Sequence, residues 1–212
     1  MTSATRVLAV RHGETLWNVA GRMQGYLDSP LDASGLSQAD ALGVRLAADS
    51  IEALYVSDLG RTLETARRIA AHTGHALVPD ARLRERHLGI FQGLTGDEAS
   101  DLYPDHWRRF RSRDPEHTLE TGESLRQFST RVVAAVEALA APHAGGTILV
   151  VTHGGVLDCL RRHATGLALD GHRTYTLLNA SLNTFSIGGS MWALVDWGDV
   201  SHLGLRDSID DV

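Results

Sequence analysis

The sequence contains a single cysteine, Cys159, and therefore cannot form a disulfide within the chain. A reducing compartment is the simplest environment for such a chain, so we expect a cytoplasmic protein. Cys159 lies in an apolar pattern with helical spacing, which favours a packed thiol over a nucleophile. The sequence also lacks an apolar run of membrane-spanning length and a basic segment followed by a long apolar one near residue 1. We accordingly expect neither a membrane span nor a signal peptide.

An excess of positive charge is also missing. The formal net charge is −6 and the sequence pI is about 6.0, which disfavours nucleic acid as a partner. A small anionic substrate would need a local basic site that acts against the overall field. The 11 histidines form no compact cluster with cysteine or carboxylates along the sequence, so we expect no metal site. Repeats and low-complexity linkers are absent, and we expect residues 1–212 to form one domain.

Short apolar runs at residues 7–10, 53–56 and 147–152 predict buried strands. Helical patterns lie between and after these runs, at residues 37–48, 62–72, 124–141 and 154–165. Alternating strands and helices predict an α/β fold, in which helices cover both faces of a parallel sheet.

The C-terminal part of the sequence follows a different pattern. Residues 181–187 and 191–197 flank Gly188-Gly189-Ser190, an arrangement typical of a β-hairpin. Such a hairpin would give the otherwise parallel sheet an antiparallel edge strand. Residues 207–212 have the composition of a frayed end.

Residues 97–122, called the excursion below, stand apart because they are rich in charged and aromatic residues. Two interpretations remain open. The excursion is either a lid whose arginines bind a second anionic group of a substrate, or a solvated helical segment whose aromatic residues pack down. The charged and aromatic residues are concentrated at Tyr103, His106, Trp107, Arg108, Arg109, Phe110, Arg111 and Arg113.

The first predicted strand leads directly into Arg11-His12-Gly13. Ligands of open α/β sheets bind beyond the carboxyl ends of the strands. A fixed positive charge beside an imidazole, with a glycine that allows close backbone approach, suits an anion that reacts. Taken alone, the tripeptide is equally compatible with a surface Arg-His pair in a turn.

Further candidate residues follow other apolar runs. Arg61 lies at the predicted start of a helix, where backbone N–H groups and the helix dipole favour an anion. The alternative there is a capping box with an exposed arginine. His153 follows the third predicted strand and precedes two glycines, and Glu85 lies between Arg84 and Arg86.

These residue types suit phosphoryl transfer, in which charge spreads over three equatorial oxygens and catalysis depends on positioning and electrostatics. Arg11 and Arg61 can hold those oxygens through bidentate hydrogen bonds. Neutral His12 can attack phosphorus, while protonated His153 adds a third cation. Glu85 can protonate the leaving oxygen and then accept a proton from water. This scheme requires no metal or other cofactor.

Five blocks of the sequence, in order, resemble the histidine phosphatase superfamily, also called the phosphoglycerate mutase-like family. The similarity extends from residue 6 to about residue 203. It implies a three-layer α/β/α sandwich around a mostly parallel sheet with an antiparallel edge. The blocks are Arg11-His12-Gly13-Glu14-Thr15, Ser57-Asp58-Leu59-Gly60-Arg61-Thr62, Leu83-Arg84-Glu85, Leu88-Gly89 with Gly93, and Thr152-His153-Gly154.

The resemblance also implies a role for individual residues. His12 matches the family's phosphohistidine, and Glu85 matches its proton donor. Asn18 resembles the family's pocket asparagine, and Gln24 and Gly25 align with a loop that contacts substrate phosphate. The phosphate-binding residues that the resemblance implies are Arg11, Asn18, Gln24, Gly25, Arg61, His153 and Gly154.

Within this family, two activities remain open. Cofactor-dependent phosphoglycerate mutases share Arg86-His87, but they continue with an insertion that closes the site against water, whereas Leu94-Thr95 leads directly into an apparent helix. Mutases also commonly carry asparagine where this chain has Gly155. Both differences favour a phosphatase that acts on a small phosphorylated metabolite. We expect this protein to be a monomer or a homodimer. A non-catalytic module that binds a phosphorylated ligand is a third, more distant alternative.

Overall fold

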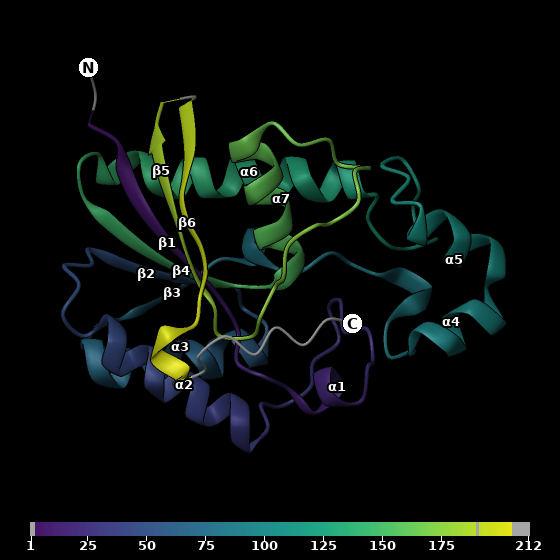
Figure 1. Cartoon of the computed structure of the whole chain (residues 1–212), viewed down its shortest axis with the longest axis horizontal. Helices are drawn as coiled ribbons and strands as arrows, with labels where there is room; N and C mark the ends of the chain where they lie inside the picture. Colours follow the sequence, from purple (N-terminus) through teal and green to yellow (C-terminus); the bar gives the residue numbers. More distant parts are fainter. Residues whose placement is uncertain (1–2, 190, 205–212) are drawn as a thin grey trace.

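One mixed sheet forms the centre of the molecule (Figure 1). The computed structural model describes residues 3–189 and 191–204. Its strands are β1 (Thr5–Arg11), β2 (Ala53–Val56), β3 (Leu77–Pro79), β4 (Thr147–Thr152), β5 (Leu182–Gly188) and β6 (Met191–Asp199). The strand order is β3-β2-β4-β1-β5-β6, with parallel pairing from β3 to β1 and antiparallel pairing from β1 to β6.

Helices cover both faces of this sheet and produce three layers. The longer helices are α2 (Ala33–Leu46), α3 (Gly60–Thr73), α6 (Leu125–Ala140) and α7 (Gly154–Thr165). Val7 and Ala9 of β1 pack with α6 and α7, whereas Leu8 and Val10 pack with α2 and α3. One strand supplies both cores because its successive side chains point to opposite faces. Figure 1 shows the two helix pairs on opposite sides of the sheet, which confirms the predicted sandwich.

The register of the central strands determines where the site forms. β1 and β4 pair in parallel, with Arg11 opposite Thr152. The next residues along the two strands are His12 and His153, so both histidines lie at the same edge of the sheet. Two motifs that are far apart in the sequence are therefore brought together by the pairing.

Several predicted boundaries differ from the observed ones. α2 begins at Ala33 rather than residue 37, because Asp32 caps the helix and accepts a hydrogen bond from the backbone N–H of Gly35 at 2.7 Å. β3 was not predicted. The predicted antiparallel edge is confirmed and contains two strands, since β5 lies between β1 and β6. Ser190 of the predicted hairpin and residues 207–212 lie outside the described residues.

The excursion contains α4 (Gly96–Leu102) and α5 (Pro104–Arg111) and extends beyond the sheet (Figure 1). The ring centroids of Trp107 and Phe110 lie 5.7 and 5.4 Å from that of buried Phe91. The aromatic residues therefore pack inward, as one of the two interpretations of the excursion expects. Shorter elements are α1 (Leu16–Val19), η1 (Ala81–Leu83), η2 (Gly89–Phe91), η3 (Ala141–His143) and η4 (Ser201–Leu203). In the part of the chain described here, no helix has both the length and the apolar character that crossing a membrane requires.

Candidate active site

His12 is buried immediately after β1. Its Nδ1 lies 2.8 Å from the carbonyl oxygen of Gly13. A carbonyl only accepts, so Nδ1 carries the proton and Nε2 keeps a free lone pair. Burial, together with Arg61 and Arg11 nearby, lowers the pKa of His12 well below its usual value. His12 is therefore neutral near pH 7, as a histidine nucleophile must be.

Arg61 lies in the first turn of α3, and its side chain is 1% exposed. The guanidinium donates hydrogen bonds to the carbonyl oxygens of Gly25 and Leu27 at 2.8 and 3.0 Å and pairs with Asp28 at 3.0 Å. Asp28 also accepts from the backbone N–H of Arg61 and so caps the helix. The alternative of an exposed arginine is wrong, because these partners hold the guanidinium inside the protein.

Arg11 ends β1 and donates from Nη1 to the carbonyl oxygen of Leu177. Burial, with Arg173 and Arg61 adding to it and Glu85 opposing it, lowers the pKa of Arg11 to about 10. Arg11 still remains protonated at neutral pH. Within the described residues, the buried Nε atoms of Arg11 and Arg61 have no hydrogen-bond partner. Both guanidinium groups therefore keep a donor for a bound anion.

His153 caps α7 and is fully buried. Its Nε2 lies 2.7 Å from Oγ of Ser57, and its ring meets the His12 ring edge-on at a centroid distance of 5.4 Å. Burial, Arg61 and His12 lower the pKa of His153 well below its usual value. Without a ligand His153 is therefore neutral near pH 7, and its predicted role as a third cation depends on bound phosphate. A bound phosphate dianion would favour protonation again.

Glu85 follows η1, in a loop held to the sheet by a hydrogen bond from the Thr152 hydroxyl to the Leu83 carbonyl oxygen at 2.9 Å. Its two carboxylate oxygens accept from the backbone N–H groups of Gly155 and Arg86, each at 2.9 Å. A side chain at position 155 would overlap the Glu85 carboxylate. The glycine at this position thus lets Glu85 approach the N-terminus of α7, where the helix dipole favours negative charge.

The cations expected beside Glu85 point elsewhere. Arg84 forms a bidentate ion pair with Asp58 at 2.5 and 2.6 Å. The Arg86 guanidinium donates to the carbonyl oxygens of Glu123 and His117 and so ties the Glu85 loop to the end of the excursion. Sequence adjacency failed as a guide here because neighbouring residues of an extended segment project in different directions.

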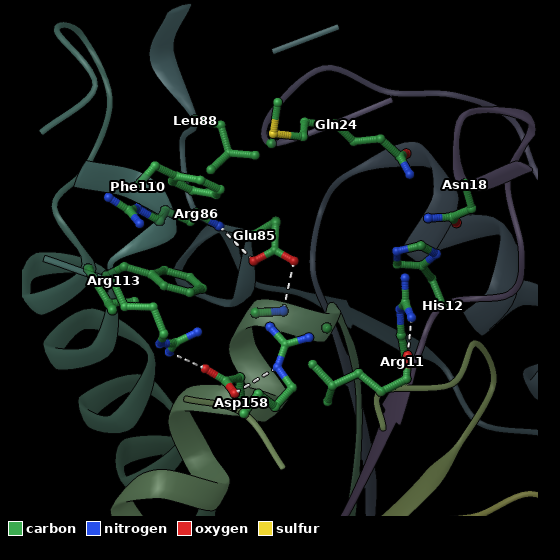
Figure 2. A pocket seen from close by; sticks show the side chains of 18 of the residues that line it. Arg11, His12, Asn18, Gln24, Glu85, Arg86, Leu88, Phe110, Arg113 and Asp158 are labelled. Carbon is green, nitrogen blue, oxygen red and sulfur yellow. Dashed lines mark hydrogen bonds and ion pairs between the residues drawn. The ribbon is translucent and has the colours of Figure 1, made fainter. Parts of the chain in front are cut away.

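Asn18 and Gln24 both use part of their amide groups within the protein. The side-chain oxygen of Asn18 accepts from the backbone N–H of Thr15 at 3.1 Å, and Figure 2 shows its amide nitrogen facing the ring of His12. The amide nitrogen of Gln24 donates to the Thr15 hydroxyl at 2.9 Å. Asn18 therefore keeps donors for a ligand, whereas Gln24 primarily supports the Asn18 turn.

Gly25 and Gly154 have structural reasons for their small size. Gly25 has φ of +56° and presents its carbonyl oxygen to Arg61. A Cβ at Gly154 would lie 3.3 Å from Nε of Arg11, the atom that remains available to an anion. Both glycines therefore protect the position of an arginine.

A cavity of about 920 Å³ brings most of these residues together. His153 is the exception, because it lies behind His12 rather than in the cavity wall. The group Arg11, His12, Arg61, Glu85 and His153 is called the proximal site below. The predicted site residues that line the cavity are Arg11, His12, Asn18, Gln24, Gly25, Arg61, Glu85 and Gly154.

Several residues near the cavity were absent from the predicted site. Asn179 donates from its amide nitrogen to the His12 carbonyl oxygen at 3.1 Å and holds the backbone of the proposed nucleophile. Asp158 and Arg173 also line the cavity. A carboxylate within the apolar pattern of residues 154–165 was the available signal for Asp158, whereas Arg173 lies in a segment without any periodicity.

Within residues 3–189 and 191–204, no three histidine, cysteine or carboxylate side chains are grouped as metal ligands. The proximal site offers imidazole, guanidinium and carboxyl groups for chemistry.

Comparison with known proteins gives a consistent assignment. Residues 7–200 match the family model for the histidine phosphatase superfamily (branch 1). The metal-independent phosphoserine phosphatase of Arabidopsis thaliana is 39% identical over 207 residues, which cover 95% of this chain and 84% of that protein. The probable phosphoglycerate mutase GpmB of Klebsiella pneumoniae (strain 342) is 39% identical over 203 residues, covering 93% and 94%. The solved structure of Bacillus stearothermophilus YhfR has a TM-score of 0.89 at 36% identity, with 94% and 100% of the two chains covered.

Proposed function

Because this chain belongs to the histidine phosphatase superfamily, branch 1, we propose that it hydrolyses a small phosphomonoester through a phosphohistidine on His12. The observation that carries this proposal is the state of His12. The imidazole is neutral, Gly13 holds its Nδ1–H, and Nε2 keeps its lone pair beside Arg11 and Arg61. A histidine nucleophile requires this combination of tautomer and charge.

In the first step, Nε2 of His12 attacks phosphorus, and the bond between phosphorus and the ester oxygen breaks. Glu85 in its protonated form gives its proton to that oxygen, which leaves as an alcohol. Arg11 and Arg61 hold the equatorial oxygens as charge develops on them. The dianion favours protonation of His153, which then adds a third cation behind His12.

In the second step, the Glu85 carboxylate removes a proton from water, and the water oxygen attacks phosphorus. The bond between phosphorus and Nε2 of His12 breaks, and inorganic phosphate leaves. His12 is again neutral and Glu85 is again protonated, so the cycle closes without a metal.

Two features support hydrolysis over transfer to a second substrate. Only Leu94 and Thr95 separate Gly93 from α4, which leaves no room for a closing insertion at that point. Mutases commonly carry asparagine at the position of Gly155. In this chain a side chain there would overlap the Glu85 carboxylate. The name of the Arabidopsis relative, metal-independent phosphoserine phosphatase, is consistent with this activity.

Phosphoglycerate mutase activity is the second candidate. The Arg86-His87 pair supports it, as does the name of the Klebsiella relative. Conversion of 3-phosphoglycerate to 2-phosphoglycerate, stimulated by 2,3-bisphosphoglycerate, is the assay. Phosphate release that exceeds isomerisation by at least about tenfold in kcat/KM would assign the chain to the phosphatases.

The phosphohistidine is tested by incubating the protein with a ³²P-labelled phosphomonoester in the presence of EDTA and quenching in alkali, where phosphohistidine survives. We expect label on His12 during turnover and no label on His12→Gln. His163→Gln is the matched control, because His163 lies on the exposed side of α7. Turnover by the wild type without label on His12 would contradict the mechanism, and equal phosphate release by His12→Gln would indicate a binding module.

A further inference from the structure

The cavity is larger than the phosphate-binding site requires. A volume of about 920 Å³ matches pockets that enclose a whole small molecule. Figure 2 shows His12 and Arg113 on opposite sides of the cavity, with Glu85 between them in this view. Phe110, Arg113 and Asp158 lie on the side away from His12 in Figure 2, and Arg111, Arg173 and Tyr175 also line the cavity. The part of the substrate beyond its phosphate must therefore lie among these side chains.

Asp158 connects three separate segments on that side. Its carboxylate is 4% exposed and lies 2.7 Å from the Arg113 guanidinium, which follows α5 (Figure 2). It also pairs with Arg173 at 3.3 Å and accepts from the Tyr175 hydroxyl at 2.7 Å, both from the segment between α7 and β5. Arg162, one turn further along α7, contributes a third guanidinium at 3.1 Å. These five residues form the distal cluster.

The distal cluster carries more positive than negative charge. Three guanidinium groups share the single carboxylate of Asp158, and in the described part of the chain none of the three forms an ion pair with a second carboxylate. Arginines on the outer face of the excursion differ, since Arg108 pairs with its own Asp105. Arg113 and Arg173 line the cavity, and only one carboxylate, that of Asp158, faces them in the cluster. Positive charge therefore exceeds negative charge at this part of the wall, where a further anion would be stabilised.

The surplus charge extends toward the catalytic residues. Arg173 is close enough to contribute to the lowered pKa of Arg11, second among the nearby charges only to Glu85, which opposes it. Its side chain is 43% exposed, so it can reorient toward a ligand. The cations of this cavity are all arginines, because the chain contains no lysine. Guanidinium groups bind carboxylates through paired hydrogen bonds, as the cluster already does with Asp158.

We propose that the distal cluster is a second anion-binding subsite, which takes a carboxylate of the substrate. Arg113 and Arg173 bind this carboxylate, and Asp158 positions the two arginines. The inference rests on the proposed phosphatase function for the placement of the phosphate, and it identifies the substrate class as phosphorylated carboxylic acids.

Binding and turnover separate the two proposals. Calorimetry measures Kd for 4-carboxybenzylphosphonate and for 4-carbamoylbenzylphosphonate, which have nearly the same shape and differ by one negative charge. The corresponding 3-carboxy and 3-carbamoyl compounds test a shorter distance between the phosphonate and the second group. We expect the carboxylate to bind about tenfold more tightly in at least one pair, as for hydrogen bonds to charged groups, with the preference falling as salt is added.

Arg173→Gln should reduce this preference to about one, because the carboxylate compound loses more affinity than the carbamoyl compound. Arg108→Gln is the matched control and should retain the preference. Asp158→Asn should also lose the preference, although Arg173→Gln suffices if the Asp158 variant does not fold. Equal affinities of the wild type for both members of both pairs would overturn the subsite.

Phosphate release from the corresponding carboxyphenyl and carbamoylphenyl phosphates is measured in parallel. A carboxylate preference in binding without any phosphate release would leave the subsite standing and refute the phosphatase. Release from both esters at equal kcat/KM, together with equal phosphonate affinities, would support the phosphatase and refute the subsite.

Discussion

The proximal site is held mainly by backbone groups, whereas the distal cluster is held mainly by ion pairs between side chains, with the backbone carbonyls of Leu169 and Ala168 as further acceptors. Gly13 holds the ring of His12 through its carbonyl oxygen, and Gly155 holds Glu85 through its N–H. In the distal cluster, by contrast, the Asp158 carboxylate holds Arg113 and Arg173. The geometry of the first region therefore depends on the fold, and that of the second on a few side chains.

This difference matters because the two kinds of contact respond differently to solvent and to mutation. A backbone group keeps its place as long as the sheet and helices are intact. An ion pair that includes a partly exposed arginine such as Arg173 is weakened by salt and is lost when one side chain changes. Under the proposed function, the reacting groups are thus fixed by the fold, while recognition of the rest of the substrate can change around Asp158.

The largest expected effect comes from Glu85→Gln. Loss of the general acid should reduce kcat/KM for an alkyl phosphate by about 10²- to 10⁴-fold. The loss should be smaller for 4-nitrophenyl phosphate, because its leaving group needs little protonation. Steady-state kinetics on both esters measure the difference.

The same variant sharpens the comparison between the two regions. Glu85→Gln should slow the carboxyphenyl and carbamoylphenyl phosphates by the same factor, since the proximal site acts on both. Arg173→Gln should slow the carboxyphenyl phosphate more than the carbamoylphenyl phosphate. A Glu85→Gln enzyme that selectively loses the carboxylate substrate would show that the two regions are not separate.

The residues of the proximal site were largely predictable, and the reason is their position in the sheet. Arg11, His12 and His153 directly follow apolar strands, so their convergence follows from parallel pairing. The contacts of Glu85 were not predictable. They depend on a hydrogen bond between Thr152 and the loop at Leu83, which has no signature in the sequence.

The distal cluster escaped prediction for a related reason. Asp158 is one polar residue in a helical pattern, where a solvent-facing position is the usual outcome, and it is buried only because arginines from two other segments reach it. β3 was missed because it pairs over only three residues and ends in Pro79. Both depend on tertiary partners that sequence periodicity does not encode.

A smaller effect is expected on stability as a function of pH. In the folded protein the pKa values of His12 and His153 lie well below the ordinary 6.5, first because of burial. Below about pH 6.5 the unfolded chain therefore binds protons that the folded chain does not, so stability falls as pH decreases. Each histidine should contribute about 1.4 kcal/mol per pH unit in that window, which ends at its folded pKa.

Urea unfolding of the wild type and His153→Asn at several values between pH 5 and pH 7 measures this slope. In His153→Asn, the slope of the free energy of unfolding against pH should be smaller by the contribution of one histidine, about 1.4 kcal/mol per pH unit. The distal cluster should not contribute in this range, because Arg113, the Tyr175 hydroxyl and Arg173 outweigh burial and keep the pKa of Asp158 below its ordinary 3.8. Identical slopes for the two proteins would mean that His153 is protonated in the folded state.

The smallest effect concerns Ala180, whose backbone N–H donates to the His12 carbonyl oxygen at 3.2 Å although its φ is +55°. The left-handed conformation costs an alanine roughly 1–2 kcal/mol, and part of any gain from glycine is offset by the freer unfolded chain. The Ala180 methyl group is also buried in the core, so glycine loses about 0.8 kcal/mol of burial. Ala180→Gly should therefore change the free energy of unfolding by less than about 0.5 kcal/mol, whereas the control Ala134→Gly on the exposed side of α6 should lower it by about 1 kcal/mol. We expect unchanged kcat for Ala180→Gly, because both hydrogen bonds to the His12 carbonyl oxygen, from Ala180 and Asn179, remain. A fall in kcat at unchanged stability would show that backbone strain, and not hydrogen bonding alone, positions the nucleophile.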